Sequence, residues 1–202
     1  PLQQYLLETE PGRLQSFDVV WDTENGGWFH LYPDQDLPPD DGLHWTGPYK
    51  TWNARCAECH ATGYEKTYDA RTRSYASTQS EIGVGCEACH GPGAAHLAWA
   101  EDTTQAPPEG YGFSQPFATT EATIQQCATC HSRREAHTDA SPEPGTPYHD
   151  AYGLALLRPG LYHADGQIRD EVYVYGSFLQ SKMYAAGVGC LDCHDAHSAM
   201  RV

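Results

Sequence analysis

The chain has few basic side chains and no long apolar run. Its 202 residues contain 12 Lys and Arg against 27 acidic residues, which gives a formal charge of −15. Such a chain is poorly suited to nucleic acid or to an anionic membrane surface, because both attract Lys and Arg. No apolar stretch approaches the ~20 residues that a membrane-spanning helix requires. The composition therefore argues against a nucleic-acid-binding protein and against a membrane span.

Two of the large apolar residue types that usually fill a core are also scarce. Met occurs twice and Phe five times, whereas Tyr occurs 13 times and Trp five times. A core made only of these side chains would be thin, so we expect another group to occupy the interior. The chain begins at Pro1 without a basic segment followed by an apolar one, so we expect the mature chain to lack its signal peptide.

The cysteines follow a single pattern. All eight fall in four Cys-x-x-Cys pairs, and each pair is followed directly by His. Since only 11 residues are His, the chance of this arrangement is on the order of one in a hundred thousand, and the pattern is that of c-type haem attachment. The motifs are Cys56-Ala-Glu-Cys59-His60 (motif 1), Cys86-Glu-Ala-Cys89-His90 (motif 2), Cys127-Ala-Thr-Cys130-His131 (motif 3) and Cys190-Leu-Asp-Cys193-His194 (motif 4).

The chemistry of the haem explains this spacing. Two thiols three residues apart can add to the two vinyl groups of one porphyrin, and the next residue then lies beneath the iron as its proximal ligand. A disulfide scaffold would not require His after every second Cys. Zinc knuckles usually complete their ligand set with a second pair at finger-like spacing, and a thioredoxin-type pair normally occurs once. The sequence therefore predicts four covalent haem c groups.

Four haems in a chain of this length would form most of the core. We expect a single tetrahaem domain over residues 1–202, with a haem-free N-terminal part (1–50) and a haem-bearing part (51–202). The fold class is predicted to be mainly irregular, with short α-helices and a few small β-hairpins. Thioether bonds form where reduced cysteines meet haem outside the cytoplasm, so the protein is expected to be periplasmic or extracellular.

Seven histidines remain for the opposite faces of the irons. Two Met residues are too few for four irons, whereas seven His suffice for bis-histidine ligation throughout. Such an iron is six-coordinate and suited to moving single electrons. His30 alternates along a predicted strand and is expected to be structural. The preferred distal ligands are His44, His96, His163 and His197, with His149 and His137 ranked below them.

Two other groups of charged residues have alternative interpretations. Arg133 and Arg134 come directly after motif 3, and their planar guanidinium groups could bind haem propionates. The alternative is that both are solvated surface charges. Four aspartates crowd a Pro-rich loop, where clustered carboxylates could hold calcium. A solvated acidic loop is the simpler interpretation of Asp34, Asp36, Asp40 and Asp41.

Local patterns predict a few regular elements. Residues 17–21 and 28–32 read as two strands joined by a turn at Asn25-Gly26-Gly27, and residues 64–68 and 74–78 read as a second hairpin. Helices are predicted from Thr120 to His131 with a Thr cap at Thr119 or Thr120, over 178–186, and from Pro92 through His96 and Trp99. Loops are expected over 34–48, 103–117 and 139–160.

Several segments resemble a known family. Residues 52–60, 83–93, 173–178 and 187–195 are similar to multihaem cytochromes c related to the tetrahaem cytochrome of nitrifying bacteria, and to their tetratricopeptide-linked relatives. The resemblance extends over nearly the whole chain. It implies that His44, His96, His163 and His197 fall in recurrent motifs, whereas His137 does not.

These observations predict an electron carrier rather than an enzyme. The expected partners are redox proteins or extracellular electron acceptors, and the surplus of His over irons suggests a head-to-tail homopolymer. The main alternative is a multihaem reductase of a small nitrogen or sulfur oxyanion with one five-coordinate haem. A third is an interaction module that merely carries haem, whose haems would lack a continuous chain of close contacts.

Overall fold

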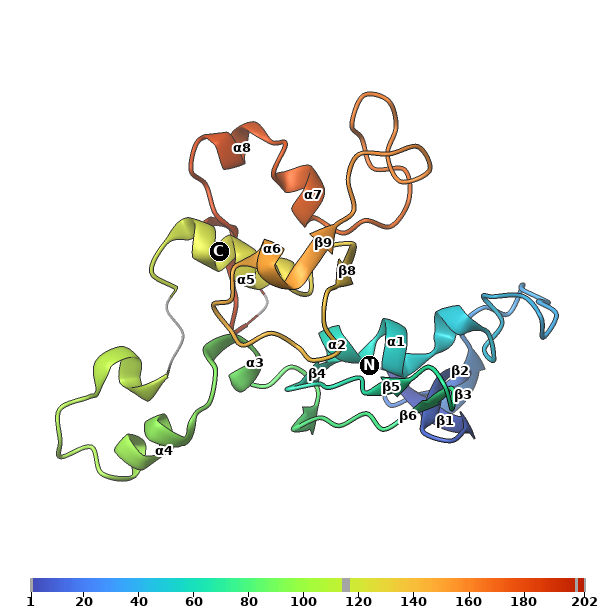
Figure 1. Cartoon of the computed structure of the whole chain (residues 1–202), viewed down its shortest axis with the longest axis horizontal. Helices are drawn as coiled ribbons and strands as arrows, with labels where there is room; N and C mark the ends of the chain where they lie inside the picture. Colours follow the sequence, from blue (N-terminus) through green and yellow to red (C-terminus); the bar gives the residue numbers. More distant parts are fainter. Residues whose placement is uncertain (1, 114–116, 199, 202) are drawn as a thin grey trace. The chain divides into compact units, whose positions relative to one another are not determined.

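The computed structural model describes residues 2–113, 117–198 and 200–201 (Figure 1). It is mainly irregular chain with short helices and small antiparallel sheets, as predicted. None of its described helices is long and apolar enough to cross a membrane. It divides into two compact units: the N-terminal unit (Pro1–Val84 with Asp139–Ser141) and the C-terminal unit (Gly85–Thr138 with Pro142–Val202).

A three-stranded antiparallel sheet opens the N-terminal unit, in the order β1 (Leu2–Glu10), β2 (Arg13–Asp22), β3 (Gly27–His30). The predicted hairpin is confirmed, because β2 and β3 pair through Val19 with His30 and Trp21 with Trp28. Strand β1 was not predicted from the sequence. Almost all of its residues are exposed, so it shows no alternation of buried apolar and exposed polar side chains by which a strand is recognised.

The second predicted hairpin is also present, although its strands are short. Strand β5 (Tyr68–Asp69) pairs with β6 (Ser74–Tyr75), and Glu65 bridges Thr78 further out. Asp69 shapes the turn, because its carboxylate accepts the backbone N–H of Arg71 at 2.8 Å.

Motif 1 lies in a short run of the N-terminal unit: η1 (Pro48–Lys50), α1 (Trp52–Arg55), α2 (Ala57–His60) and β4 (Ala61–Thr62), which pairs with β7 (Glu81–Ile82). Its core is small, with Ala57, Ala61 and Tyr64 buried and Trp52 packed against them. Buried Asn53 ties this run to the sheet by accepting from the N–H of Leu14 at 2.8 Å. Hydrogen bonds therefore add to the few apolar contacts that hold the run carrying motif 1 in place.

The C-terminal unit is built around α5 (Thr120–Ala128), which carries the start of motif 3. The predicted cap is confirmed, since the Thr119 hydroxyl accepts the N–H of Ala122 at 3.1 Å. The helix ends three residues before the predicted His131, although the N–H of His131 still bonds to the carbonyl of Cys127. The buried cluster packed around α5 consists of Ile124, Ala128, Tyr148, Ala151, Tyr152 and Tyr175.

Other elements of this unit correct the sequence predictions. The predicted loop 139–160 contains α6 (Tyr148–Ala151) and β9 (Tyr152–Leu154), which pairs with β8 (Arg134–Ala136). Tyr148 and Tyr152 are buried, and this burial fixes a segment whose Pro and Gly content is typical of a loop. The predicted loop 103–117 includes η2 (Glu109–Gly112), and its residues 114–116 lie outside the described residues.

Two predicted helices have different bounds. Helix α4 (Ala94–Glu101) begins after Pro92, because the carboxylate of Glu87 holds the N–H of Gly93 at 2.7 Å in a turn. The single helix predicted over 178–186 is two, α7 (Tyr175–Phe178) and α8 (Lys182–Ala185). Ser181 separates them, since its hydroxyl caps α8 by accepting the N–H of Tyr184 at 3.1 Å.

Candidate haem sites

The first three motifs form the same local structure. In each, the His N–H donates to the carbonyl of the first Cys, at 3.0 Å in motif 1, 2.9 Å in motif 2 and 3.0 Å in motif 3. These i to i+4 bonds close one helical turn, which brings residues three and four apart onto the same face. Both thiols and the imidazole of a motif are therefore presented to the same side. Motif 2 forms this turn in α3 (Glu87–His90).

Motif 4 is built differently. It begins as η3 (Cys190–Asp192), in which the N–H of Cys193 donates to the carbonyl of Cys190 at 3.2 Å. Asp192 caps this turn by accepting the N–H of Gly189 at 2.7 Å. His194 then starts β10 (His194–Asp195), which pairs with β11 (Met200–Arg201). The backbone of His194 in motif 4 is thus held by a two-residue β ladder rather than by a helical turn.

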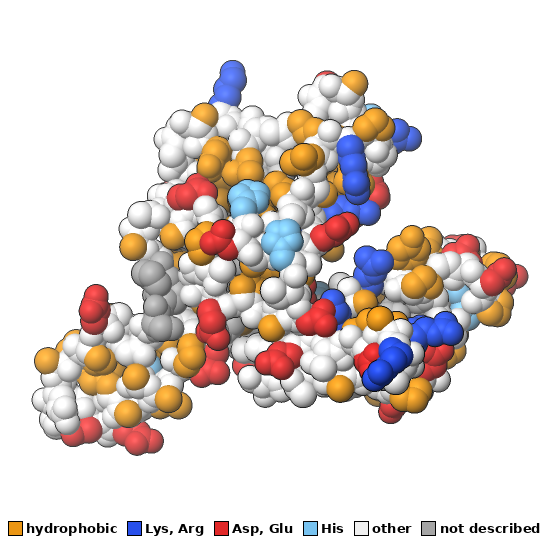
Figure 2. Space-filling view, viewed as in Figure 1, with side chains coloured by type: hydrophobic (Ala, Val, Ile, Leu, Met, Phe, Trp, Pro, Cys, Tyr) orange, Lys and Arg blue, Asp and Glu red, His pale blue; other side chains and the backbone are white. Residues whose placement is uncertain are grey.

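The thiols suit covalent attachment of haem. None of the eight cysteines, all of them among the described residues, forms a disulfide. Apolar side chains beside the motifs are exposed, including Ile82 and Val84 before motif 2, Leu97 after it and Leu191 within motif 4. Figure 2 shows hydrophobic side chains over much of the visible face. A porphyrin would cover such surface, so the residues present fit the group that the motifs imply.

Motif 2 has a second imidazole opposite its own. The rings of His90 and His197 are 6.0 Å apart between centroids and only 13° from parallel. Burial lowers the pKa of His90, and the neighbouring His197 and His96 lower it further. His197 is held in place by Asp195, whose carboxylate accepts its backbone N–H at 3.0 Å. The segment after motif 4 therefore reaches back to motif 2.

His96 lies on α4 with its ring oriented by the backbone. Its Nδ1 is 2.8 Å from the carbonyl oxygen of Tyr111. A carbonyl can only accept, so Nδ1 carries the proton and the lone pair is left on Nε2, the arrangement common in metal-binding histidines. The ring also stacks on Phe113, with centroids 4.5 Å apart. His96 is thus prepared to act as a ligand through Nε2.

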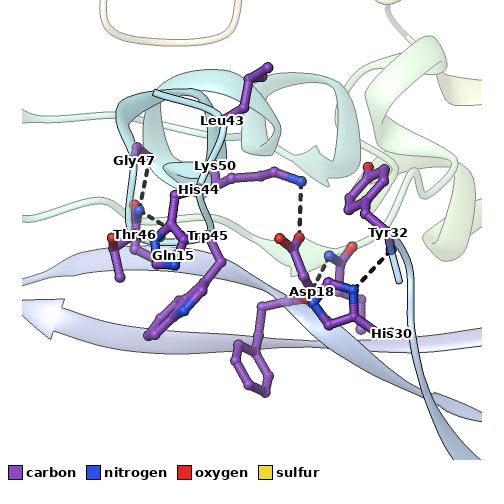
Figure 3. A network of polar contacts seen from close by, with 12 residues as sticks. Gln15, Asp18, His30, Tyr32, Leu43, His44, Trp45, Thr46, Gly47 and Lys50 are labelled. Carbon is purple, nitrogen blue, oxygen red and sulfur yellow. Dashed lines mark hydrogen bonds and ion pairs between the residues drawn. The ribbon is translucent and has the colours of Figure 1, made fainter. Parts of the chain in front are cut away.

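His44 and His30 lie in the N-terminal unit, and the Nδ1 of each accepts a nearby backbone N–H (Figure 3). The Nδ1 of His44 is 2.7 Å from the hydroxyl of Thr46 and accepts the backbone N–H of Thr46 at 3.3 Å, in a turn closed by the N–H of Gly47. The Nδ1 of His30 accepts the N–H of Tyr32 at 3.0 Å. These contacts do not separate a ligand from a structural histidine, so the structural role of His30 and the ligand role of His44 stay predictions from the sequence.

The remaining histidines are exposed in the C-terminal unit. His163 opens a turn closed by the N–H of Gly166 at 3.0 Å, and the ring of His149 packs edge-on against Tyr148. The backbone N–H of His137 bonds to Ala151 at 2.9 Å. Their selection as ligands rests on the sequence.

Motifs 2, 3 and 4 are brought together around α5. Gln126 of α5 donates to the carbonyl of Ala88 in motif 2 at 3.3 Å. The Cys127 thiol at the end of α5 is hydrogen-bonded to the Cys190 thiol of motif 4, and this contact raises the pKa of Cys127 and lowers that of Cys190 to about 7. Together with the His90–His197 pair, these contacts link each of the three motifs to the other two. The spacing of the motifs along the chain gave no indication of this.

The charged groups singled out in the sequence have protein partners. Arg133 donates to the carboxylate of Asp170 at 3.0 Å and to the carbonyl of Glu171, while Arg134 lies over the ring of Tyr152 at 4.0 Å. The carboxylate of Asp41 accepts the N–H of Leu43 at 2.8 Å. Within the described ranges no three His, Cys, Asp or Glu side chains converge as metal ligands, so the aspartates predicted as a calcium alternative form no cage there.

Sequence reasoning missed one charged pair near motif 1. Lys50 forms an ion pair of 2.9 Å with Asp18, and both side chains are largely buried. Lys50 is one of few basic residues in an acidic chain, a scarcity that could have drawn attention to it. Its partner is 32 positions away, and the sequence gives no sign of that contact.

Comparisons with known proteins agree with the motifs. Residues 43–91 match the family model described as cytochrome c554 and c-prime, which covers motifs 1 and 2. The outer cell wall cytochrome OcwA is a structural neighbour with a TM-score of 0.60 at 19% identity, over 98% of this chain and 43% of OcwA. An undecahaem cytochrome from the S-layer of Carboxydothermus ferrireducens aligns with a TM-score of 0.38 at 20% identity, over 96% of this chain and 32% of the other. No curated protein sequence matches.

The chain thus spans less than half the length of either neighbour. The likeness to OcwA supports the predicted fold class, an irregular multihaem cytochrome c fold with short helices and small sheets.

Proposed function

We propose that the chain is an electron-transfer protein with four c-type haems, one on each Cys-x-x-Cys-His motif, whose irons are closed by a second histidine. A bound haem supplies an iron that alternates between the ferric and ferrous states. The residues of the chain attach it, orient the imidazoles and exclude water from the iron. The observation that carries the proposal is the near-parallel pair of His90 and His197.

The spacing of that pair suits two ligands of one metal. A ligating imidazole nitrogen lies about 2 Å from a first-row metal and its ring centroid about 1 Å further, so two imidazoles on opposite faces have centroids roughly 6 Å apart. The distance of 6.0 Å agrees with this. A direct ring stack would be closer, as with His96 and Phe113 at 4.5 Å. We therefore assign His197 as the second ligand of the motif 2 iron.

His44, His96 and His163 are our candidates for the other three irons, with His149 and His137 in reserve. The best-supported of these is His96, because its Nδ1 contact with Tyr111 leaves Nε2 available. Closed irons leave no position for a substrate, which favours an electron carrier over a reductase of a small nitrogen or sulfur oxyanion.

Optical spectroscopy tests this proposal. The pyridine haemochrome should give four haems per chain, and the dithionite-reduced spectrum should not change when carbon monoxide is added. A change at a fraction of the haems would reveal an open iron, and the reductase would become the better account. A count other than four would contradict the assignment of one haem to each motif.

The setting and partners follow from the same chemistry. Thioether attachment takes place outside the cytoplasm, so we propose a periplasmic or extracellular protein. With a formal charge of −15, the chain is complementary to redox partners or acceptors with a basic surface. The His surplus also favours a head-to-tail homopolymer, in which one copy ligates a haem of the next. Electron cryomicroscopy that shows only dispersed monomers would exclude the polymer and leave electron transfer intact.

A further inference from the structure

A nearly buried ion pair lies in the N-terminal unit beside motif 1. The ammonium of Lys50, at the end of η1, is 2.9 Å from the carboxylate of Asp18 on β2, and their side chains are only 15% and 10% exposed. The same ammonium is 4.2 Å from the centre of the Tyr32 ring. Figure 3 shows Lys50 extended toward Asp18. Both charges are therefore withdrawn from water.

The pair is close to the first thiol of motif 1. On β2, Ser16 and Asp18 are both buried and are separated by one residue. The hydroxyl of Ser16 is hydrogen-bonded to the thiol of Cys56. Gln15 fixes η1 against the same strand by donating to the carbonyl of Gly47 at 2.9 Å. Asp18 and Lys50 are thus held at a defined place near the Cys56 side chain.

Stability alone is a poor explanation for such a pair. Removing two charges from water costs free energy that their attraction often does not recover, and an apolar replacement is frequently as stable. Partly buried charges do act strongly on neighbouring charged groups, because screening by water is weak there. Burial raises the pKa of the Cys56 thiol, and the cations of Lys50 and Arg55 partly offset this rise. Arg55 packs over the Tyr49 ring, 5.5 Å from its centre.

We propose that Lys50 and Asp18 set the reduction potential of the iron held by motif 1. Reduction adds one negative charge to the iron site, so Lys50 favours the reduced form and Asp18 opposes it. This inference rests on the proposed function, because it requires a haem on Cys56, Cys59 and His60.

Three variants of the haem-loaded protein test it: Lys50→Met, Asp18→Asn and the double variant, each titrated by optical potentiometry. Lys50→Met should lower the midpoint of one haem component, Asp18→Asn should raise it, and the double variant should fall between them. Damage to the fold would move both single variants in one direction. Shifts of the same sign, no shift, or a shift of all components would overturn the inference.

The chain offers a matched control in Lys66. It pairs with Asp139 at 2.7 Å in the same unit, but these side chains are 32% and 51% exposed. Lys66→Met should leave every midpoint unchanged, because water screens the exposed pair; a shift equal to that of Lys50→Met would also overturn the inference. The haem count from the pyridine haemochrome distinguishes a failure of the proposed function from a failure of this inference. A chain without haem contradicts the proposed function, whereas four haems with unchanged midpoints contradict only the role of Lys50 and Asp18.

Discussion

The two units of the molecule support their motifs in different ways. The N-terminal unit holds a single motif beside a three-stranded sheet and secures it with hydrogen bonds from Asn53 and Gln15. The C-terminal unit holds three motifs, its sheets are two-stranded, and the motifs contact one another through Gln126, Cys127 and His197. The comparison indicates that a backbone framework supports motif 1, whereas motifs 2 to 4 depend on each other and on the groups bound to them.

The largest difference between the units is expected without haem. In a chain produced without haem attachment, the C-terminal unit should lose its structure while the β1–β3 sheet persists, because three haem-bearing motifs contact one another in the C-terminal unit, whereas backbone ladders hold the sheet. Limited proteolysis with mass spectrometry would locate the cuts. We expect them first in residues 85–138 and 142–201. Equal protection of both units would contradict the comparison.

Loss of one second ligand should affect one site of the C-terminal unit. His197→Ala removes the ring opposite His90, so carbon monoxide should then bind to about one haem in four on the proposed stoichiometry. The change in the reduced spectrum on adding the gas measures this. His30→Ala is the matched control in the other unit, since His30 is expected to be structural and is not among the proposed ligands. Binding in the control but not in His197→Ala would reverse the assignment.

A polar substitution should weaken the framework of the N-terminal unit. Asn53 is 3% exposed and accepts the N–H of Leu14 while donating to Gly12 and Ser77. Asn53→Ala leaves those groups without this partner and should lower the free energy of unfolding by about 1–3 kcal/mol. Guanidinium denaturation followed by circular dichroism measures the loss.

Asn25→Ala serves as the control for that measurement. Asn25 is exposed and donates to Asp22 at 2.6 Å in a surface turn. Its substitution should change the free energy of unfolding by less than about 0.5 kcal/mol. Equal losses in the two variants would mean that Asn53 does not anchor motif 1.

The smallest effect is expected at the start of α5. Thr119→Ala removes the hydroxyl that accepts the N–H of Ala122 and should cost about 1 kcal/mol. Thermal unfolding should therefore begin at a lower temperature in this variant. Thr119→Ser keeps a capping hydroxyl and should recover most of the loss. A Ser variant as unstable as the Ala variant would show that the cap is not the cause.

The sequence was sufficient to predict some local features of the fold. The β2–β3 hairpin, the β5–β6 hairpin and the cap at Thr119 were predicted because each depends on residues close together in the chain. Strand β1 was missed because its residues are almost all exposed and show no alternation of apolar and polar side chains. The break between α7 and α8 was missed because Ser181 was read as part of a helix rather than as a cap.

The candidate haem sites also combine local features that the sequence predicted with non-local contacts that it did not. The motifs were identified by adjacent residues, but the approach of His197 to His90 and of Cys127 to Cys190 joins segments 107 and 63 positions apart. The ion pair of Lys50 with Asp18 is also non-local. Such contacts depend on how the irregular segments pack, and no local pattern encodes that.

The most direct test of the account is a crystal structure of the haem-loaded protein with anomalous scattering recorded at the iron edge. Four iron peaks are expected, one of them between the rings of His90 and His197 and another beside His60. An iron at motif 2 with His197 remote from it, or bound to a different iron, would contradict the proposed arrangement of the C-terminal unit.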